Sequence, residues 1–496
     1  MLKPEINSEG VKRLIKTVED RSVVESRFPQ SSEITEIIAV EPQLSTLSCE
    51  VADGRINYGG KAVLTIVYSD EEGKLCRMQK GVEFSHYLDG EDFAPAQVGV
   101  CALKCDKATF RRDGSSFVIS IVVAAHICVY EQGERAYLTT AEGAFIKNEE
   151  LNLCSVVTFT GESEVEDDFE ADSLIDVLIP SAKAVVLSCE CGTGDVDISG
   201  EIYLSLFAMR RQSPVCIERV IPFKMTAPCD DASAGVNAAA WVEISDLNLN
   251  ATVNEDKGRC NLNFTCTISA NGWFTAMRSE SVAVDAFSAD NALNLTFAKE
   301  SNLVCREIKV YSENVKGLAA AKSRLSYDCQ FCAAVLPVAE CEYNAAEGCA
   351  EGAVSCHLIY LQGGEVKSTE ITLPVSVGLK GVAQSGQSVS LDIAVSGISV
   401  KLKAEGEAEA AASLKICATV CDNNECSYVS AIEEGERIVP NDCAVSVFLP
   451  AAGDGLWEVA KKLNKSPSDV LVCNPELSFP LCGKERILIY RSKCNG

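Results

Sequence analysis

The chain has 496 residues, of which 47% are hydrophobic, 23% are charged and 6% are aromatic. This composition is that of a folded protein with several domains, and it excludes a fibrous or largely disordered chain. The 71 acidic and 44 basic residues give a formal net charge of −27. Such an acidic chain excludes a general nucleic-acid binder and argues against docking on anionic lipid by charge alone.

The first 30 residues predict an N-terminal helix that begins near Ser8. Its apolar stripe follows helical spacing and consists of Val11, Leu14, Ile15 and Val18. We expect this stripe to pack on the first β unit, with docking to a partner as the alternative. The segment carries no apolar run followed by a small-residue cleavage site, so a cytoplasmic location is expected.

Three segments further along share one β-strand pattern, in which a glycine opens an apolar run of nine residues. The runs are GKAVLTIVY from Gly60, GEIYLSLFA from Gly200 and GAVSCHLIY from Gly352. A second strand follows at an offset of 24, 23 and 23 residues from the glycine, and contains Phe84, Phe223 and Val375. A turn glycine comes at offsets of 54, 58 and 54 residues: Gly114, Gly258 and Gly406.

Offsets that agree this closely predict a repeat of about 100 residues, and short strands at that size predict a β-sandwich or open barrel. We expect a mostly β protein with repeats at 31–133, 173–274 and 331–430, followed by a linker at 431–442 and a C-terminal module at 443–496. Residues 134–172 and 275–330 are expected to connect the repeats. The long uncharged stretch from Ser115 to Tyr130 predicts a buried strand, and no direct membrane insertion is expected.

The connectors have their own composition. Residues 162–172 carry seven acids, which predicts a solvated connector. A calcium site is the alternative, but the ordered acidic loop of such sites is missing. Residues 282–297 predict a pair of strands, or a short helix and a strand.

The 25 cysteines are expected to be reduced in a cytosolic protein and to act as small hydrophobic residues. The tightest group contains Cys329, Cys332, Cys341 and Cys349. Its C-x-x-C opening admits a zinc site, yet the second pair is eight residues apart and no histidine is close, so ordinary thiols are favoured. No metal or cofactor is predicted.

Catalytic patterns are scarce, because only His86, His126 and His357 are present. His126 and His357 lie in apolar strands and are expected in the core, whereas His86 lies near a strand end. No metalloprotease, nucleotide-binding or nucleophile-elbow motif occurs. We therefore expect a protein that is not an enzyme.

The C-terminal module differs from the rest in charge, with a net +2 against −29 for the preceding residues. Residues 444–449 and 487–490 predict strands. Between them, an apolar stripe predicts a first helix: Leu456, Val459, Ala460 and Leu463. Ser466 and Pro467 predict the start of a second short helix that ends at Asn474 and Pro475. The predicted order is β-α-α-β.

This module resembles the LysM domain. The residues in register with the family signature are Gly453, Asp454, Leu456, Trp457, Val459, Ala460, Asn474, Pro475 and Leu477. Gly455 departs from it, because the family usually has threonine there. The resemblance implies a groove between the loops at 453–456 and 474–477. Its candidate binding residues are Gly453, Asp454, Gly455, Leu456, Trp457, Asn474, Pro475, Glu476 and Leu477. Trp457 either packs in the core or stacks on a ligand.

The β repeats, the C-terminal module and a VDAFS segment at 284–288 together resemble the SipL-like family of spore-coat morphogenetic proteins, whose repeats are called SPOCS domains. The resemblance implies a non-enzymatic scaffold in the mother cell at the forespore surface. It also implies that the LysM domain tethers the coat by binding the coat basement ATPase (the stage IV sporulation morphogenetic protein). The alternative is a peptidoglycan-binding protein that engages spore cortex or cell-wall glycan.

Overall fold

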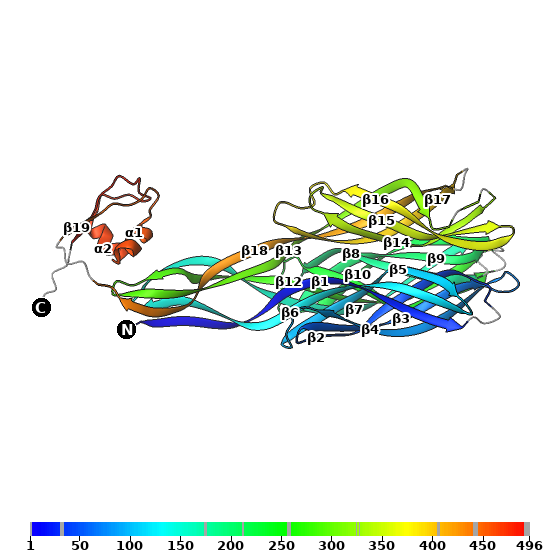
Figure 1. Cartoon of the computed structure of the whole chain (residues 1–496), viewed down its shortest axis with the longest axis horizontal. Coiled ribbons are helices and arrows are strands. Elements are labelled where there is room, and N and C mark those ends of the chain that lie inside the picture. Colours follow the sequence, from blue (N-terminus) through cyan, green and yellow to red (C-terminus); the bar gives the residue numbers. More distant parts are fainter. Residues whose placement is uncertain are drawn as a thin grey trace.

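The computed structural model describes residues 2–29, 34–172, 176–210, 213–254, 259–323, 325–326, 328–403, 407–439 and 445–490 (Figure 1). Within these ranges the protein is mostly β, as predicted, with two short helices near the C-terminus. None of the described helices is long and apolar enough to cross a membrane.

Eighteen strands form three similar units of six strands each. The first unit contains β1 (Lys3–Pro29), β2 (Glu36–Ala52), β3 (Arg55–Ser69), β4 (Leu75–Asp89), β5 (Gln97–Asp113) and β6 (Ser116–Glu142). The second contains β7 (Phe145–Asp172), β8 (Asp176–Cys191), β9 (Asp195–Arg210), β10 (Ser213–Pro228), β11 (Ala239–Asn254) and β12 (Arg259–Phe287). The third contains β13 (Asn291–Ala321), β14 (Gln330–Asn344), β15 (Cys349–Gln362), β16 (Glu365–Gly378), β17 (Ser388–Leu402) and β18 (Ala408–Arg437).

Each unit is a sandwich of two antiparallel three-stranded sheets, and in the third unit pairing between β13 and β16 joins the two into one six-stranded sheet. One sheet takes the first and the last two strands, in the orders β1-β6-β5, β7-β12-β11 and β13-β18-β17. The other takes the middle three, in the orders β2-β3-β4, β8-β9-β10 and β14-β15-β16. Apolar side chains from both sheets fill the space between them in each unit. β12 illustrates the pattern, because it buries every second residue from Cys260 to Ala270.

The repeat glycines lie at equivalent places in these sandwiches. Gly60 pairs with Phe84 across β3 and β4, Gly200 pairs with Phe223, and Gly352 pairs with Val375. The offsets of 24, 23 and 23 residues in the sequence therefore separate residues that are paired across neighbouring strands. A side chain at Gly200 would overlap the Val185 carbonyl oxygen and the Phe223 ring. The position requires glycine because the partner ring lies over its backbone.

We predict that Gly200→Ala lowers the free energy of unfolding by about 1–3 kcal/mol, because the new methyl group overpacks the sandwich. Urea denaturation of the full chain measures the change. Gly10→Ala is the control, since its methyl group would meet nothing closer than Gln132 Nε2 at 3.6 Å. Equal losses in both variants would contradict this explanation.

The predicted N-terminal helix is wrong, because residues 3–29 form strand β1 and pair with β6 along their whole length. A bulge at Ile15 explains the misleading spacing. Val11 lies opposite Gly133 and Val18 lies opposite Ile127, so residues seven apart on β1 face residues six apart on β6. Both valines therefore face the same side of the sheet, as they would on a helix.

The predicted connectors at 134–172 and 275–330 contain β7 and β13, which are the first strands of the second and the third unit. Residues 162–172 belong to β7, which is the edge strand of its sheet and pairs with β12. Six of the seven acids point outward along one face: Glu162, Glu164, Glu166, Asp168, Glu170 and Asp172. Such a charged edge opposes pairing with another chain. Residues 282–297 form two strands, as one alternative predicted, but these strands pair with other partners.

The three units form one body, which corrects the expectation of modules separated by linkers. Strands from the middle sheets of all three units meet in a shared apolar cluster. Val67, Phe207 and Ile359 lie in it with none of their surface exposed. Each follows its repeat glycine by seven residues. The repeat therefore encodes the contact between units as well as the fold of each unit.

Three two-stranded arms extend from this body and converge at one end (Figure 1). The first arm pairs residues 3–12 with 132–142, the second pairs 145–157 with 274–287, and the third pairs 291–304 with 422–437. Small apolar clusters hold the arms together. They contain Tyr137, Leu138 and Ala141 from the first arm, Leu153, Val282, Ala283 and Ala286 from the second, and Tyr428, Val429 and Ile432 from the third.

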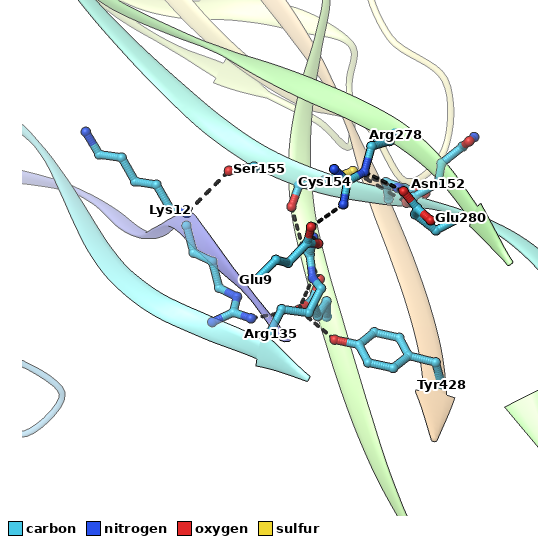
Figure 2. A network of polar contacts seen from close by, with 12 residues as sticks. Glu9, Lys12, Arg135, Asn152, Cys154, Ser155, Arg278, Glu280 and Tyr428 are labelled. Carbon is cyan, nitrogen blue, oxygen red and sulfur yellow. Dashed lines mark hydrogen bonds and ion pairs between the residues drawn. The ribbon is translucent and has the colours of Figure 1, made fainter. Parts of the chain in front are cut away.

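A network of polar contacts crosses between the arms and includes Glu9, Arg135 and Tyr428 (Figure 2). Arg135 has 2% of its side chain exposed and contacts Glu300 at 2.6 Å, with Glu300 5% exposed. Arg135 also binds Glu9 at 3.1 Å, and Tyr428 donates to Glu300 at 3.0 Å. Burial raises the pKa of Glu300, but the hydrogen bonds from Arg135 and Arg13 outweigh it, so the net pKa is lowered.

Arg135→Ala is expected to cost about 3–5 kcal/mol of stability, because it leaves the Glu300 carboxylate buried without its main partner. Arg278→Ala is the control on the same network, since Arg278 also binds Glu9 but is 61% exposed. The loss of stability in Arg278→Ala should be much smaller than in Arg135→Ala. Thermal and urea unfolding of both variants measure the difference. A similar effect from the exposed arginine would refute the role of the buried pair.

Candidate functional site

The C-terminal module contains β19 (Val445–Phe448), α1 (Leu456–Leu463), α2 (Pro467–Cys473) and β20 (Ile487–Tyr490). β19 and β20 pair antiparallel, so the predicted β-α-α-β order is confirmed. The buried core of the module is small: Val459, Ala460, Val470, Leu481 and Ile487. Ser466 Oγ accepts from the Asp469 N–H at 2.9 Å and Pro467 is the first residue of α2, as expected for this helix start.

Two of the predicted binding residues hold the module together. Asp454 is 9% exposed, accepts from the Ala451 N–H at 2.8 Å and receives Lys462 Nζ at 2.8 Å. Asn474 is also 9% exposed, and its amide binds Leu488 through both its nitrogen and its oxygen at 2.8 Å. Their polar groups are therefore occupied inside the module.

The other predicted residues divide by exposure. Gly453, Pro475 and Glu476 are exposed, whereas Leu456 and Leu477 are half-buried against the module core. Gly455 begins α1 without a capping side chain, and its N–H donates to the Glu458 carboxylate at 3.0 Å. The predicted groove residues thus include structural groups as well as exposed ones.

Trp457 is half-buried and contacts the tip of the second arm. Its ring lies 5.0 Å from the Phe287 ring at an angle of 67°, and Phe287 in turn lies 5.0 Å from Phe145. Trp457 Nε1 donates to Asp285 Oδ2 at 2.8 Å. The tryptophan therefore has partners outside its own module, and Phe287 shares the module's apolar cluster.

Lys461 completes this contact. Its Nζ lies 2.5 Å from Asp285 Oδ1, and it stands four residues after Trp457 on the same side of α1. Asp285 and Phe287 are two residues apart on β12, which places both side chains on one side of the strand. We call the side of α1 that carries Trp457 and Lys461 the Trp457 face.

The sequence carries a signal for this contact. Asp285 and Phe287 lie in the VDAFS segment at residues 284–288. Asp285 and Phe287 are two residues apart, a spacing that places side chains on one side of a strand. Trp457 and Lys461 are four apart, a spacing that places side chains on one side of a helix. Nothing in the sequence indicated that the two segments meet, because 172 positions separate Trp457 from Asp285.

No protein-family model, curated protein or solved structure matches this chain.

The histidines do not gather into one site. His86 lies on β4, His126 on β6 and His357 on β15. Burial lowers the pKa of His357 to about 4. Burial also opposes the charged form of His126, but hydrogen bonds with Cys128 and Glu19 raise its pKa to about 9.

The cysteine group singled out from the sequence is spread over two apolar clusters. Cys329 and Cys341 pack against the core of the third unit, and Cys332 packs where the three units meet. Burial raises the pKa of Cys332 and of Cys341. Across the part of the chain that the structure describes, no group of three or more metal-ligating side chains is found.

The contact at Asp285 predicts a pH dependence. Burial raises the pKa of Asp285, but the hydrogen bonds from Lys461 and Trp457 outweigh it and lower the pKa below its ordinary 3.8. The contact is therefore fully stabilising above about pH 3.8 and is lost as the pH falls through the lowered value. Trp457 emission, taken as the difference between the wild type and Trp457→Phe, should shift to the red in that range. Asp285→Asn should remove this shift, and an unchanged shift would contradict the assignment.

Proposed function

We propose that this chain is a non-enzymatic scaffold of the SipL-like kind in spore-coat assembly, with three SPOCS-like units and a LysM-like module that binds another protein. The observation that carries the proposal is the place of the module. It lies at the converging end of three arms, away from the body of sandwiches (Figure 1). A small binding module that lies at the end of the arms can bind another protein at a distance from the body, as a tethering protein must.

The chemistry of the module favours a protein partner over a glycan. Asp454 and Asn474 direct their polar groups into the module, and Gly455 supplies no hydroxyl group to a sugar. Apolar side chains are exposed on the module instead. They include Leu471 (39%), Val472 (80%), Val447 (56%) and Tyr490 (50%). Exposed apolar residues on a small module suit a protein interface.

The partner that the family resemblance implies is the coat basement ATPase, and the location is the mother-cell side of the forespore. The acidic outer strand β7 supports a scaffold that stays separate from other copies of itself, because its charges oppose edge pairing. The large body then supplies area for further weak contacts, which gain strength when they are linked.

Capture of the purified basement ATPase by the immobilised full chain tests this function. We expect capture, and we expect the double variant Pro475→Ala, Glu476→Ala to weaken it by about tenfold, which corresponds to ~1.4 kcal/mol. Both residues are exposed, so the melting temperature should not change. Lys484→Ala, an exposed change elsewhere in the module, is the control. Retention of the full chain on peptidoglycan sacculi without capture of the ATPase would favour the glycan-binding alternative.

A further inference from the structure

We propose that the Trp457 face is a receptor for an extended polypeptide segment that carries a carboxylate and an aromatic ring two residues apart, and that Asp285 and Phe287 are its resident occupant. The inference deepens the proposed function, because it names the chemistry of the segment that the module recognises. It is carried by the contacts of Trp457 and Lys461 with the tip of the second arm.

The side chains on helix α1 and those on strand β12 are spaced so that they can contact one another as two pairs. Trp457 and Lys461 are four apart on α1 and project from one side of the helix. Asp285 and Phe287 are two apart on β12 and project from one side of the strand. The carboxylate and the ring thus meet the ammonium group and the indole together, whereas neighbouring residues on the strand point away.

The hydrogen bonds define which side chains suit the site. One carboxylate oxygen of Asp285 accepts from Trp457 Nε1, and the other accepts from Lys461 Nζ and from the Ala286 N–H. An amide in place of the carboxylate would lose the ion pair with Lys461. The ring of Phe287 meets the indole edge to face, and only 4% of its surface is exposed. A segment without an aromatic residue would leave this area unfilled.

The three arms offer an internal comparison. The corresponding ends, aligned by these apolar contacts, read TTAE at residues 139–142 in the first arm and SAIE at residues 430–433 in the third. Neither places an acid two residues before an aromatic residue. The arms repeat in pairing and in their apolar contacts, so the Asp-x-Phe pair of the second arm is a feature that repeat architecture does not require.

Because Asp285 and Phe287 already occupy the Trp457 face, they compete with any partner segment for it. Asp285 and Phe287 belong to the same chain as the module, so their effective concentration at the Trp457 face is high. A partner segment must displace them before it binds. The charge on Lys461 also makes recognition sensitive to salt, because 44% of this side chain is exposed.

Fluorescence anisotropy with the full chain tests the receptor. The probe is a labelled peptide of residues 281–289, SVAVDAFSA, and the control peptide replaces its Asp by Asn and its Phe by Ala. The double variant Asp285→Ala, Phe287→Ala vacates the face. We expect it to bind the probe at least tenfold more tightly than the wild type does, and to bind the control peptide no better than the wild type does. Adding Lys461→Ala to the double variant should abolish this gain.

A milder variant guards against loss of the arm's structure. Asp285→Asn retains Phe287 in the apolar cluster and removes only the ion pair, so it should bind the probe more tightly than the wild type by a smaller factor. Circular dichroism and the melting temperature check that each variant is folded. Equal affinity of the folded vacated variants for probe and control peptides would overturn the proposal.

The outcome separates this inference from the proposed function. Binding of the probe without capture of the basement ATPase would support the receptor and would defeat the scaffold proposal in its present form. Capture of the ATPase that excess probe peptide does not compete away, together with no gain of probe binding in the vacated variants, would overturn the receptor. Competition between the probe peptide and the ATPase would support both the receptor and the proposed scaffold function.

Discussion

The pairing between the first and the last strand of each unit is the interaction on which the rest of the molecule depends. β1 with β6, β7 with β12 and β13 with β18 remain paired well past the ends of their sandwiches. Within the body, each of these pairs forms two neighbouring strands of a sheet. Beyond it, the same hydrogen-bond ladders continue as arms. The extension positions the C-terminal module, because the second arm ends at the residues that contact it.

Burial between repeats explains why the arms stay together. Each arm alone is a two-stranded ribbon, and such ribbons are marginally stable in water. Three of them share apolar clusters and a buried arginine–glutamate pair, so each supplies the surface that the others need. The same logic holds in the body, where the middle sheets of the three units meet around one cluster. The repeats are therefore arranged around a common core, not along a line.

This architecture gives the binding proposals their form. The module is small, and one apolar ring from the arm, Phe287, joins its core. The arm tip is thus both a support for the module and an occupant of one of its faces. A scaffold built in this way can present its binding module at a fixed place and restrict which segments gain access to it.

The sequence by itself determined the strand-rich class, the repeat of glycine and its cross-strand partner, and the order of elements in the C-terminal module. These features are local, because they depend on side-chain alternation, on close backbone approach and on helix starts. Only the tertiary structure decided that residues 3–29 are a strand and that the acidic residues 162–172 form a sheet edge. It also placed Trp457 against Asp285 and Phe287. These outcomes depend on partners that are distant in the chain, which for β1 are the hydrogen-bonding groups of β6 and for Trp457 the tip of the second arm.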